Sequence, residues 1–150
     1  MIRAVFDTNL LVSAFLSREN PGGASTELLR FAKEGSVELY LSAEIVAETL
    51  ATLVSSERMQ RRYDYTPHMA IQYCAELLAV PMIIIDPPQI TGAVARDPDD
   101  DKIIACAIAA GAEYLVSRDH DLLALGSYGG ISIASPEALL CIVRSSAQIS

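Results

Sequence analysis

The sequence predicts a three-layer α/β/α fold built on a parallel five-stranded sheet. Short apolar runs alternate along the chain with longer segments of helical periodicity, which is typical of a parallel sheet covered by helices on both faces. The chain has 150 residues, of which 51% are hydrophobic, so it is long enough and apolar enough to bury a core. We therefore expect residues 1–150 to form a single domain.

Five short apolar runs are the expected strands. The first ends directly at Asp7, as a buried strand that stops at the edge of a sheet does. Segments of mostly helical character separate the runs, so parallel pairing is favoured. The five runs are Ile2–Phe6, Leu39–Leu41, Met82–Ile85, Tyr114–Val116 and Ile131–Ile133.

Local signals place the helices between these strands. Ser42 is expected to cap a helix that runs to about Ser56, and Pro67 is expected at the first helical position after Thr66. One side of the first of these helices carries an apolar arc of Ile45, Val46, Leu50, Leu53 and Val54. The segment Ile103–Ala110 is apolar all round, so we expect it to be buried between other layers. The other helices are predicted at Thr8–Leu16, at Ala24–Lys33, from Pro67 to about Ala79, over a short stretch that includes Leu122–Leu125, and from Pro136 onward.

Composition and charge argue against several classes of protein. Nineteen acidic residues against eleven basic ones give a net charge of −8, which disfavours binding to nucleic acid through bulk positive charge. Cys74, Cys106 and Cys141 share no CxxC spacing and are interpreted as small buried side chains in a reducing compartment. The first residues lack the layout of a signal peptide, and no apolar run reaches the roughly 18 residues of a membrane span. We expect a cytoplasmic protein without membrane contact.

Acidic residues follow the predicted strands. Asp7 comes directly after the first strand, and Asp119 and Asp121 follow the fourth. Sites in parallel α/β sheets lie off the carboxyl ends of the strands, so these residues are candidates. Glu48 lies at the edge of the apolar arc of its helix. Four more acids stand at the entrance to the apolar helix: Asp97, Asp99, Asp100 and Asp101.

These carboxylates indicate a cation site. Carboxylates gathered in a cleft repel one another, so either some of them are protonated or a cation lies between them. An all-oxygen set suits Mg²⁺ or Mn²⁺ better than zinc. Such an ion activates water and stabilises charge on a phosphoryl oxygen, and it would allow an acidic protein to act on a polyanion.

Each acid also has a simpler interpretation. The aspartate run is compatible with a solvated loop or a helix N-terminus, and Glu48 with an ordinary surface side chain. A calcium loop is excluded because Lys102 stands at the turn-glycine position and Ile108 at the position of the bidentate glutamate. The segment Phe6–Asn9 is similar to the D-x-D motif of haloacid-dehalogenase-type phosphatases, although Asn9 replaces the second aspartate.

Four segments follow one another in the order of a known family's motifs. Val5–Ala14 contains the first acid, and Ser42–Glu48 ends on the glutamate of the second motif. Asp97–Ala107 corresponds to the third motif and Ala112–Leu123 to the fourth. Together, over about residues 2–135, they resemble the PIN-domain ribonucleases, especially the VapC-like toxins of prokaryotic toxin–antitoxin systems.

The resemblance implies a PIN-like sheet and Mg²⁺- or Mn²⁺-dependent cleavage of single-stranded RNA. It implies that the catalytic, metal-binding acids are Asp7, Glu48, Asp100 and Asp119, with Asp101 as the alternative to Asp100. Supporting roles are implied for Asn9 and Ser117, which would orient carboxylates or water, and for the acids Asp97, Asp101 and Asp121. It further implies a homodimer and, for a toxin, a cognate antitoxin.

Alternatives stay open for the substrate and for the activity. The segment Glu57–Tyr65 contains Arg58, Arg61, Arg62 and two tyrosines, and it either contacts an RNA strand or forms a solvated turn that the tyrosines anchor. The alternatives to a ribonuclease are a small-molecule phosphatase and a PIN-like binding module without catalysis.

Overall fold

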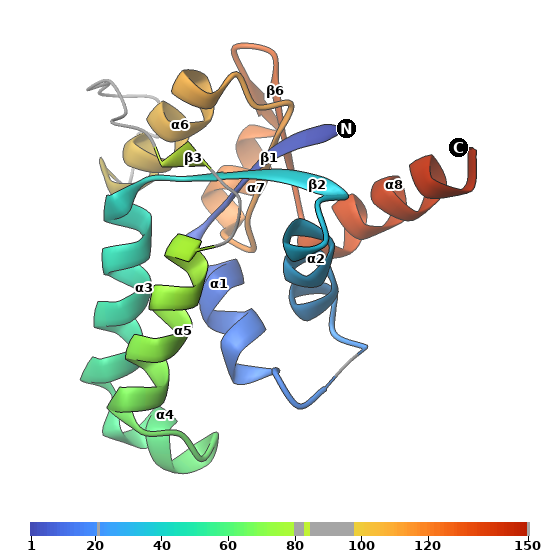
Figure 1. Ribbon diagram of the computed structural model, residues 1–150. Coiled ribbons are helices and arrows are strands. Elements are labelled where there is room, and N and C mark those ends of the chain that lie inside the picture. The colour runs from blue at the N-terminus through green and yellow to red at the C-terminus, as the bar shows by residue number, and fades with distance from the viewer. Residues whose placement is uncertain (21, 80–82, 85–97, 150) are drawn as a thin grey trace.

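The computed structural model describes residues 1–20, 22–79, 83–84 and 98–149, with only the backbone of residues 83–84, 98–100 and 147–149. Within these residues a six-stranded sheet is flanked by helices (Figure 1). The strands are β1 (Ile2–Phe6), β2 (Val37–Leu41), β3 (Ile83–Ile84), β4 (Tyr114–Val116), β5 (Ser127–Tyr128) and β6 (Ile131–Ala134). The helices are α1 (Thr8–Leu16), α2 (Ala24–Lys33), α3 (Ala43–Ser55), α4 (Glu57–Arg62), α5 (Pro67–Ala79), α6 (Pro98–Ala110), α7 (His120–Leu125) and α8 (Pro136–Ile149).

The predicted parallel five-stranded sheet is confirmed, with one short strand added at its edge. The order is β3-β2-β1-β4-β6-β5, and every pairing except that of β5 with β6 is parallel. The added strand arises because Gly129 and Gly130 both have positive φ, which allows a tight two-residue hairpin turn. The run predicted at 82–85 is a strand at Ile83–Ile84, and Met82 and Ile85 lie outside the described residues.

The strand order determines which helices cover which face. The chain passes from β1 to β2 and β3 on one side, and then returns to β4 and β6 on the other side of β1. Because parallel crossovers are right-handed, α1–α5 lie on one side of the sheet, and α6 and α7 lie on the other. In Figure 1, α1, α3 and α5 lie below β2, and α6 lies above it. The order reverses between β1 and β4, and this is the position at which α/β sheets place their sites.

Local sequence signals explain where the helices begin. The side chains of Asp7, Ser42 and Asp119 cap α1, α3 and α7 by accepting hydrogen bonds from backbone amides of the first turn. The predicted boundaries of α1 and α2 are confirmed, whereas α6 begins at Pro98, ahead of the apolar run. The basic segment after Ser56 contains the short helix α4. No helix in the described part of the chain is long and apolar enough to cross a membrane.

The core lies between the sheet and its helices, and three predictions about burial were wrong. On α3, Thr49 is buried and Val54 is exposed, because Val54 lies on the side of the helix that faces solvent. Of the predicted all-apolar segment on α6, Ile103–Ala107 are buried, but Ile108 is exposed because the helix forms an outer layer. Cys74 and Cys106 are buried, but Cys141 is exposed on the outer side of α8.

Candidate functional site

Asp7 and Ser117 lie side by side, because each directly follows one of two paired strands. Phe6 at the end of β1 is paired with Val116 at the end of β4, and the Asp7 amide donates to the Val116 carbonyl at 2.9 Å. The residue that follows β4 is Ser117, whose hydroxyl donates to Asp7 Oδ2 at 2.7 Å. Register therefore brings these residues together at the point where the strand order reverses.

A hydrogen-bond network joins this pair to its neighbours. The Asn9 amide lies 3.4 Å from Asp7 Oδ2 and 3.2 Å from Ser117 Oγ, and it donates to both. The Asn9 carbonyl oxygen accepts from the backbone amide of Arg118 at 3.1 Å, and Ser117 Oγ accepts from the amide of Asp119 at 3.0 Å. Since Ser117 is fully buried, the segment that carries Asp119 is fixed relative to Asp7.

Thr8 connects Asp7 to Glu48, a role that sequence reasoning missed. Its amide donates to Asp7 Oδ1 at 2.7 Å, and its hydroxyl donates to Glu48 Oε2 at 3.3 Å. The second bond is possible because α1 packs against α3. The available signal was a hydroxyl residue at the first helical position after the acid of the first motif.

Two of the acids also have a structural role as helix caps. Asp7 caps α1, and Asp119 Oδ2 accepts from the Leu122 amide at 3.1 Å to cap α7. The positive ends of both helices favour a carboxylate at these positions. Capping explains each acid separately, but it does not explain a buried serine and an asparagine that join the two segments. Helix capping alone therefore does not account for the way in which Asn9 and Ser117 hold Asp7 and Asp119 close together.

The described residues of the third motif lie on α6, on the opposite side of the sheet from α1 and α3 and at the same edge as Asp7. Asp101, the fourth residue of α6, is 6% exposed, and α6 packs against β1, β2 and β4. The Lys102 ammonium lies 3.1 Å from Glu44 Oε1, which brings the start of α6 beside the start of α3. Asp97 lies outside the described residues, as do the side chains of Asp99 and Asp100.

Asp121 is separate from this network. It lies in the first turn of α7 with an exposed side chain, next to exposed His120. The hydrogen bonds between described residues do not join it to Asp7, Ser117 or Asp119.

The described carboxylates have the chemistry of a hard-cation site. Asp7, Glu48 and Asp119 offer only oxygen atoms, which suits Mg²⁺ or Mn²⁺. Among the described side chains, no group of three histidine, cysteine or acidic residues has the arrangement of a metal site. A site of the expected kind also requires an acid of the third motif, where the Asp100 side chain lies outside the described residues. The carboxylate oxygens of Asp7, Glu48 and Asp119 are donors that fit Mg²⁺ or Mn²⁺.

The three arginines proposed to contact RNA lie away from the carboxylates. Arg58, Arg61 and Arg62 are exposed on α4, beyond the far end of α3. Since α3 starts beside the acidic edge and has 13 residues, α4 lies about 20 Å farther along. Tyr65 is buried and donates to the Leu53 carbonyl at 2.8 Å, so this tyrosine anchors the turn.

A separate cavity of about 410 Å³ lies between α1, α2 and α5. Phe15 and Tyr73 are among the aromatic residues that line it, and the Tyr73 hydroxyl donates to the Leu11 carbonyl at 2.7 Å. Burial raises the pKa of Tyr73. Arg18 also lines the cavity, with its guanidinium 4.6 Å from the centre of the Phe15 ring. The cavity is lined by none of the candidate acids.

Comparison with protein families finds a match over most of the chain. The family described as the PIN domain matches residues 3–121, which is more than half of the chain. The matched segment contains Asp7, Glu48, the aspartates of the third motif, and Asp119. A comparison with curated proteins found no match.

Proposed function

Because the chain belongs to the PIN-domain family, we propose that it is a metal-dependent endoribonuclease that hydrolyses phosphodiester bonds of single-stranded RNA. PIN domains are generally nucleases that bind RNA and usually use divalent metals. The observation that carries the proposal is Asp7, held by Thr8, Asn9 and Ser117 at the point where the strand order reverses. We further propose that residues 1–150 act as a single nuclease domain.

The acids proposed to hold Mg²⁺ or Mn²⁺ are Asp7, Glu48, Asp119 and one aspartate of the third motif. The motif resemblance favours Asp100, whereas Asp101 is the one whose described side chain is buried at the start of α6. A bound ion would activate water and offset charge on the phosphoryl oxygens.

The surrounding residues preset the orientation of these acids. The Thr8 amide and the Ser117 hydroxyl occupy different oxygens of Asp7, so the carboxylate cannot rotate without breaking a short hydrogen bond. The Thr8 hydroxyl directs Glu48 toward the same edge. Such preorganisation lowers the reorganisation needed when charge develops on the substrate.

The phosphatase alternative is disfavoured by the role of Asn9. In a D-x-D enzyme the second acid transfers a proton, but the Asn9 amide donates to Asp7 and Ser117 and its carbonyl oxygen accepts from Arg118. An amide in this arrangement has no acidic proton to transfer at neutral pH. The other alternative, a binding module without catalysis, would not bind a metal ion. A measurement of metal binding therefore distinguishes it from the nuclease.

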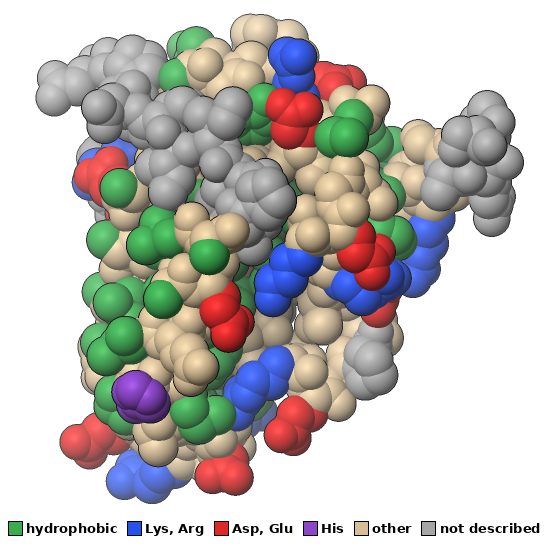
Figure 2. Space-filling view, viewed as in Figure 1, with side chains coloured by type: hydrophobic (Ala, Val, Ile, Leu, Met, Phe, Trp, Pro, Cys, Tyr) green, Lys and Arg blue, Asp and Glu red, His purple; other side chains and the backbone are tan. Residues whose placement is uncertain are grey.

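A homodimer is supported by apolar side chains on the outer side of α3 and α5. Val54, Ile71 and Leu78 are 36%, 52% and 51% exposed. Figure 2 shows hydrophobic side chains gathered over these two helices. Exposed apolar patches mark contact surfaces, and we propose that a second copy covers this one.

The toxin role is supported by the resemblance of the first motif to VapC-like toxins. A toxin of this kind acts with a cognate antitoxin, which we propose as the second partner. The test is co-expression with the product of an adjacent small open reading frame, followed by purification on a tag carried by this chain. Recovery of a stoichiometric complex supports the role, and a tagged chain recovered alone contradicts it.

The ribonuclease proposal is tested by Asp7→Asn. The change keeps the shape of the side chain and removes its charge, so cleavage of single-stranded RNA in Mn²⁺ should fall by at least the roughly 10- to 100-fold that loss of a group orienting a metal ligand costs. Calorimetry should show weaker Mn²⁺ binding, and EDTA should abolish the wild-type activity. The control is Asp64→Asn, the same chemical change at an exposed position whose positive φ asparagine tolerates. Full activity of Asp7→Asn, or of the wild type in EDTA, would contradict the proposal.

A matched pair of variants assigns the acid of the third motif. Asp100→Asn and Asp101→Asn make the same change at adjacent positions of α6. The variant that loses Mn²⁺ binding while keeping its melting temperature identifies the ligand. If neither variant changes Mn²⁺ binding, neither Asp100 nor Asp101 binds the ion.

A further inference from the structure

Two cations lie on opposite sides of the carboxylates, at the ends of the strands. In the sheet, β2 lies on one side of β1, and β4 and β6 lie on the other. Lys102 pairs with Glu44, in the first turn after β2. Arg118 follows β4 and pairs with Glu137, in the first turn after β6. The two ion pairs therefore flank Asp7, which follows β1.

On the basis of the ribonuclease function proposed above, we propose that Arg118 and Lys102 contact backbone phosphates of single-stranded RNA on the two sides of the cleaved bond. A strand that crosses the carboxylate edge from α6 to the start of α8 would pass both cations. The carboxylates alone repel such a strand in a chain whose net charge is −8, so local cations are needed to hold it.

The position of Arg118 is fixed by the same network that holds the acids. Its backbone amide donates to Asn9 Oδ1, and the Asn9 amide donates to Asp7. Its guanidinium lies 2.8 Å from Glu137 Oε1 and 3.5 Å from Ser25 Oγ. The backbone is thus held beside the acids while the side chain, 41% exposed, reaches the surface.

Both cations have partners that a phosphate can replace. The Arg118–Glu137 pair has side chains 41% and 58% exposed, and both members of the Lys102–Glu44 pair are 48% exposed. Ion pairs at such exposure contribute little to stability, so exchange of a carboxylate for a phosphate costs little. The guanidinium can bind a phosphate with two parallel hydrogen bonds, and the ammonium acts as a point charge.

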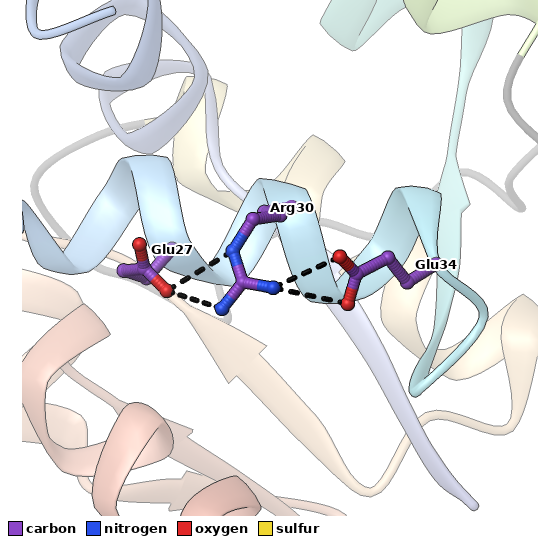
Figure 3. Close-up of polar contacts among 3 residues, drawn as sticks. All are labelled: Glu27, Arg30 and Glu34. Carbon is purple, nitrogen blue, oxygen red and sulfur yellow. Dashed lines mark hydrogen bonds and ion pairs between the residues drawn. The ribbon is translucent and has the colours of Figure 1, made fainter. Parts of the chain in front are cut away.

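Arg30 differs from Arg118 and Lys102 because two carboxylates hold it and it lies away from the candidate site. Its guanidinium binds Glu27 and Glu34 at once, with contacts of 2.6–3.2 Å (Figure 3). Hydrogen bonds to these carboxylates raise the pKa of Arg30. It lies in the last turn of α2, which leads to the amino end of β2, and so toward the opposite edge of the sheet from Asp7. Arg30→Gln is therefore a control that removes the same charge away from the proposed track.

The experiment measures binding of a fluorescent oligouridylate at increasing salt, with EDTA present so that no strand is cleaved. Each phosphate contact on a single strand contributes about 0.7 to the slope of log affinity against log salt. Arg118→Gln and Lys102→Gln should each lower the slope by about that amount, so a tenfold rise in salt weakens their binding about fivefold less than that of the wild type. Arg30→Gln should keep the wild-type slope, and Glu137→Gln should bind more tightly because a competing carboxylate is gone.

Two sets of results overturn the assignment. The first is a wild-type slope for both Arg118→Gln and Lys102→Gln in folded protein, as checked by circular dichroism. The second is an equal loss of slope in Arg30→Gln, which would indicate a general effect of charge. If Asp7→Asn still abolishes cleavage in either case, the nuclease function stands and only the phosphate contacts are wrong. If Asp7→Asn cleaves like the wild type, the function itself fails.

Discussion

The hydroxyl of Ser117 donates to Asp7 Oδ2 at 2.7 Å, across 110 positions of sequence. Ser117 Oγ also accepts from the Asp119 amide at 3.0 Å, and the serine side chain is fully buried. Two segments from neighbouring strands are thereby joined by one hydroxyl. Removal of that hydroxyl should loosen the carboxylates without exposing new surface.

We expect Ser117→Ala to weaken Mn²⁺ binding by about 10- to 100-fold, the usual cost of losing a group that orients a metal ligand. Ser117→Thr keeps the hydroxyl and should retain most of the binding. Calorimetry with Mn²⁺ measures the affinity, and melting curves in EDTA measure the fold. Equal affinity of the alanine and threonine variants would show that the hydroxyl does not position Asp7.

Thr8→Val should weaken Mn²⁺ binding by about tenfold. This is the low end of the roughly 10- to 100-fold range expected for a group that orients a metal ligand, because the hydrogen bond from Thr8 to Glu48 is long at 3.3 Å. Valine has the same shape and keeps the backbone amide that binds Asp7, so only the contact with Glu48 is lost. Thr8→Ser restores the hydroxyl and should rescue the affinity. A valine variant with wild-type affinity would remove Thr8 from the site.

The fold was predictable where local signals coincide with hydrophobic periodicity. The predicted bounds of α1 and α2 match the structure, in which Asp7 caps α1 and Gly23 stands at the N-cap of α2. The strand β5 was missed because two residues carry no periodicity, and its hairpin depends on the φ of two glycines. The start of α6 was missed because its first turn is a run of aspartates, which also suits a loop.

The candidate site was predictable only in part. Strand ends and family motifs together indicated Asp7, Asn9, Ser117 and Asp119, and parallel register does bring these residues together. The Thr8–Glu48 bond depends on how α1 packs against α3, which no local pattern encodes. Asp100 and Asp101 differ by about 100° around α6, and sequence spacing does not set the rotation of that helix against the sheet.

The proposed homodimer predicts that Leu78→Glu converts the protein to a monomer. Ile71 and Leu78 lie two turns apart on the same side of α5, so a charge at either one would be buried unpaired in the interface. Light scattering coupled to size exclusion measures the mass. Ile108→Glu, at another exposed apolar residue but on α6, should leave the mass unchanged. A wild-type protein with the mass of one chain would contradict the proposal.

Alkaline pH should destabilise the fold through Cys106. Burial raises the pKa of its thiol from 9.0 to about 11, so above about pH 9 the unfolded state loses a proton that the folded state keeps. The contribution of Cys106 to the free energy of unfolding is therefore fully present below the ordinary thiol pKa. It is lost as the pH rises toward the pKa of the folded state, by up to about 3 kcal/mol for a pKa difference of two units. Urea unfolding between about pH 7 and about pH 10.5 should show a shallower alkaline decline for Cys106→Ala than for the wild type. Cys141→Ala, at the exposed cysteine, should decline like the wild type, and identical declines for all three proteins would contradict the assignment to Cys106.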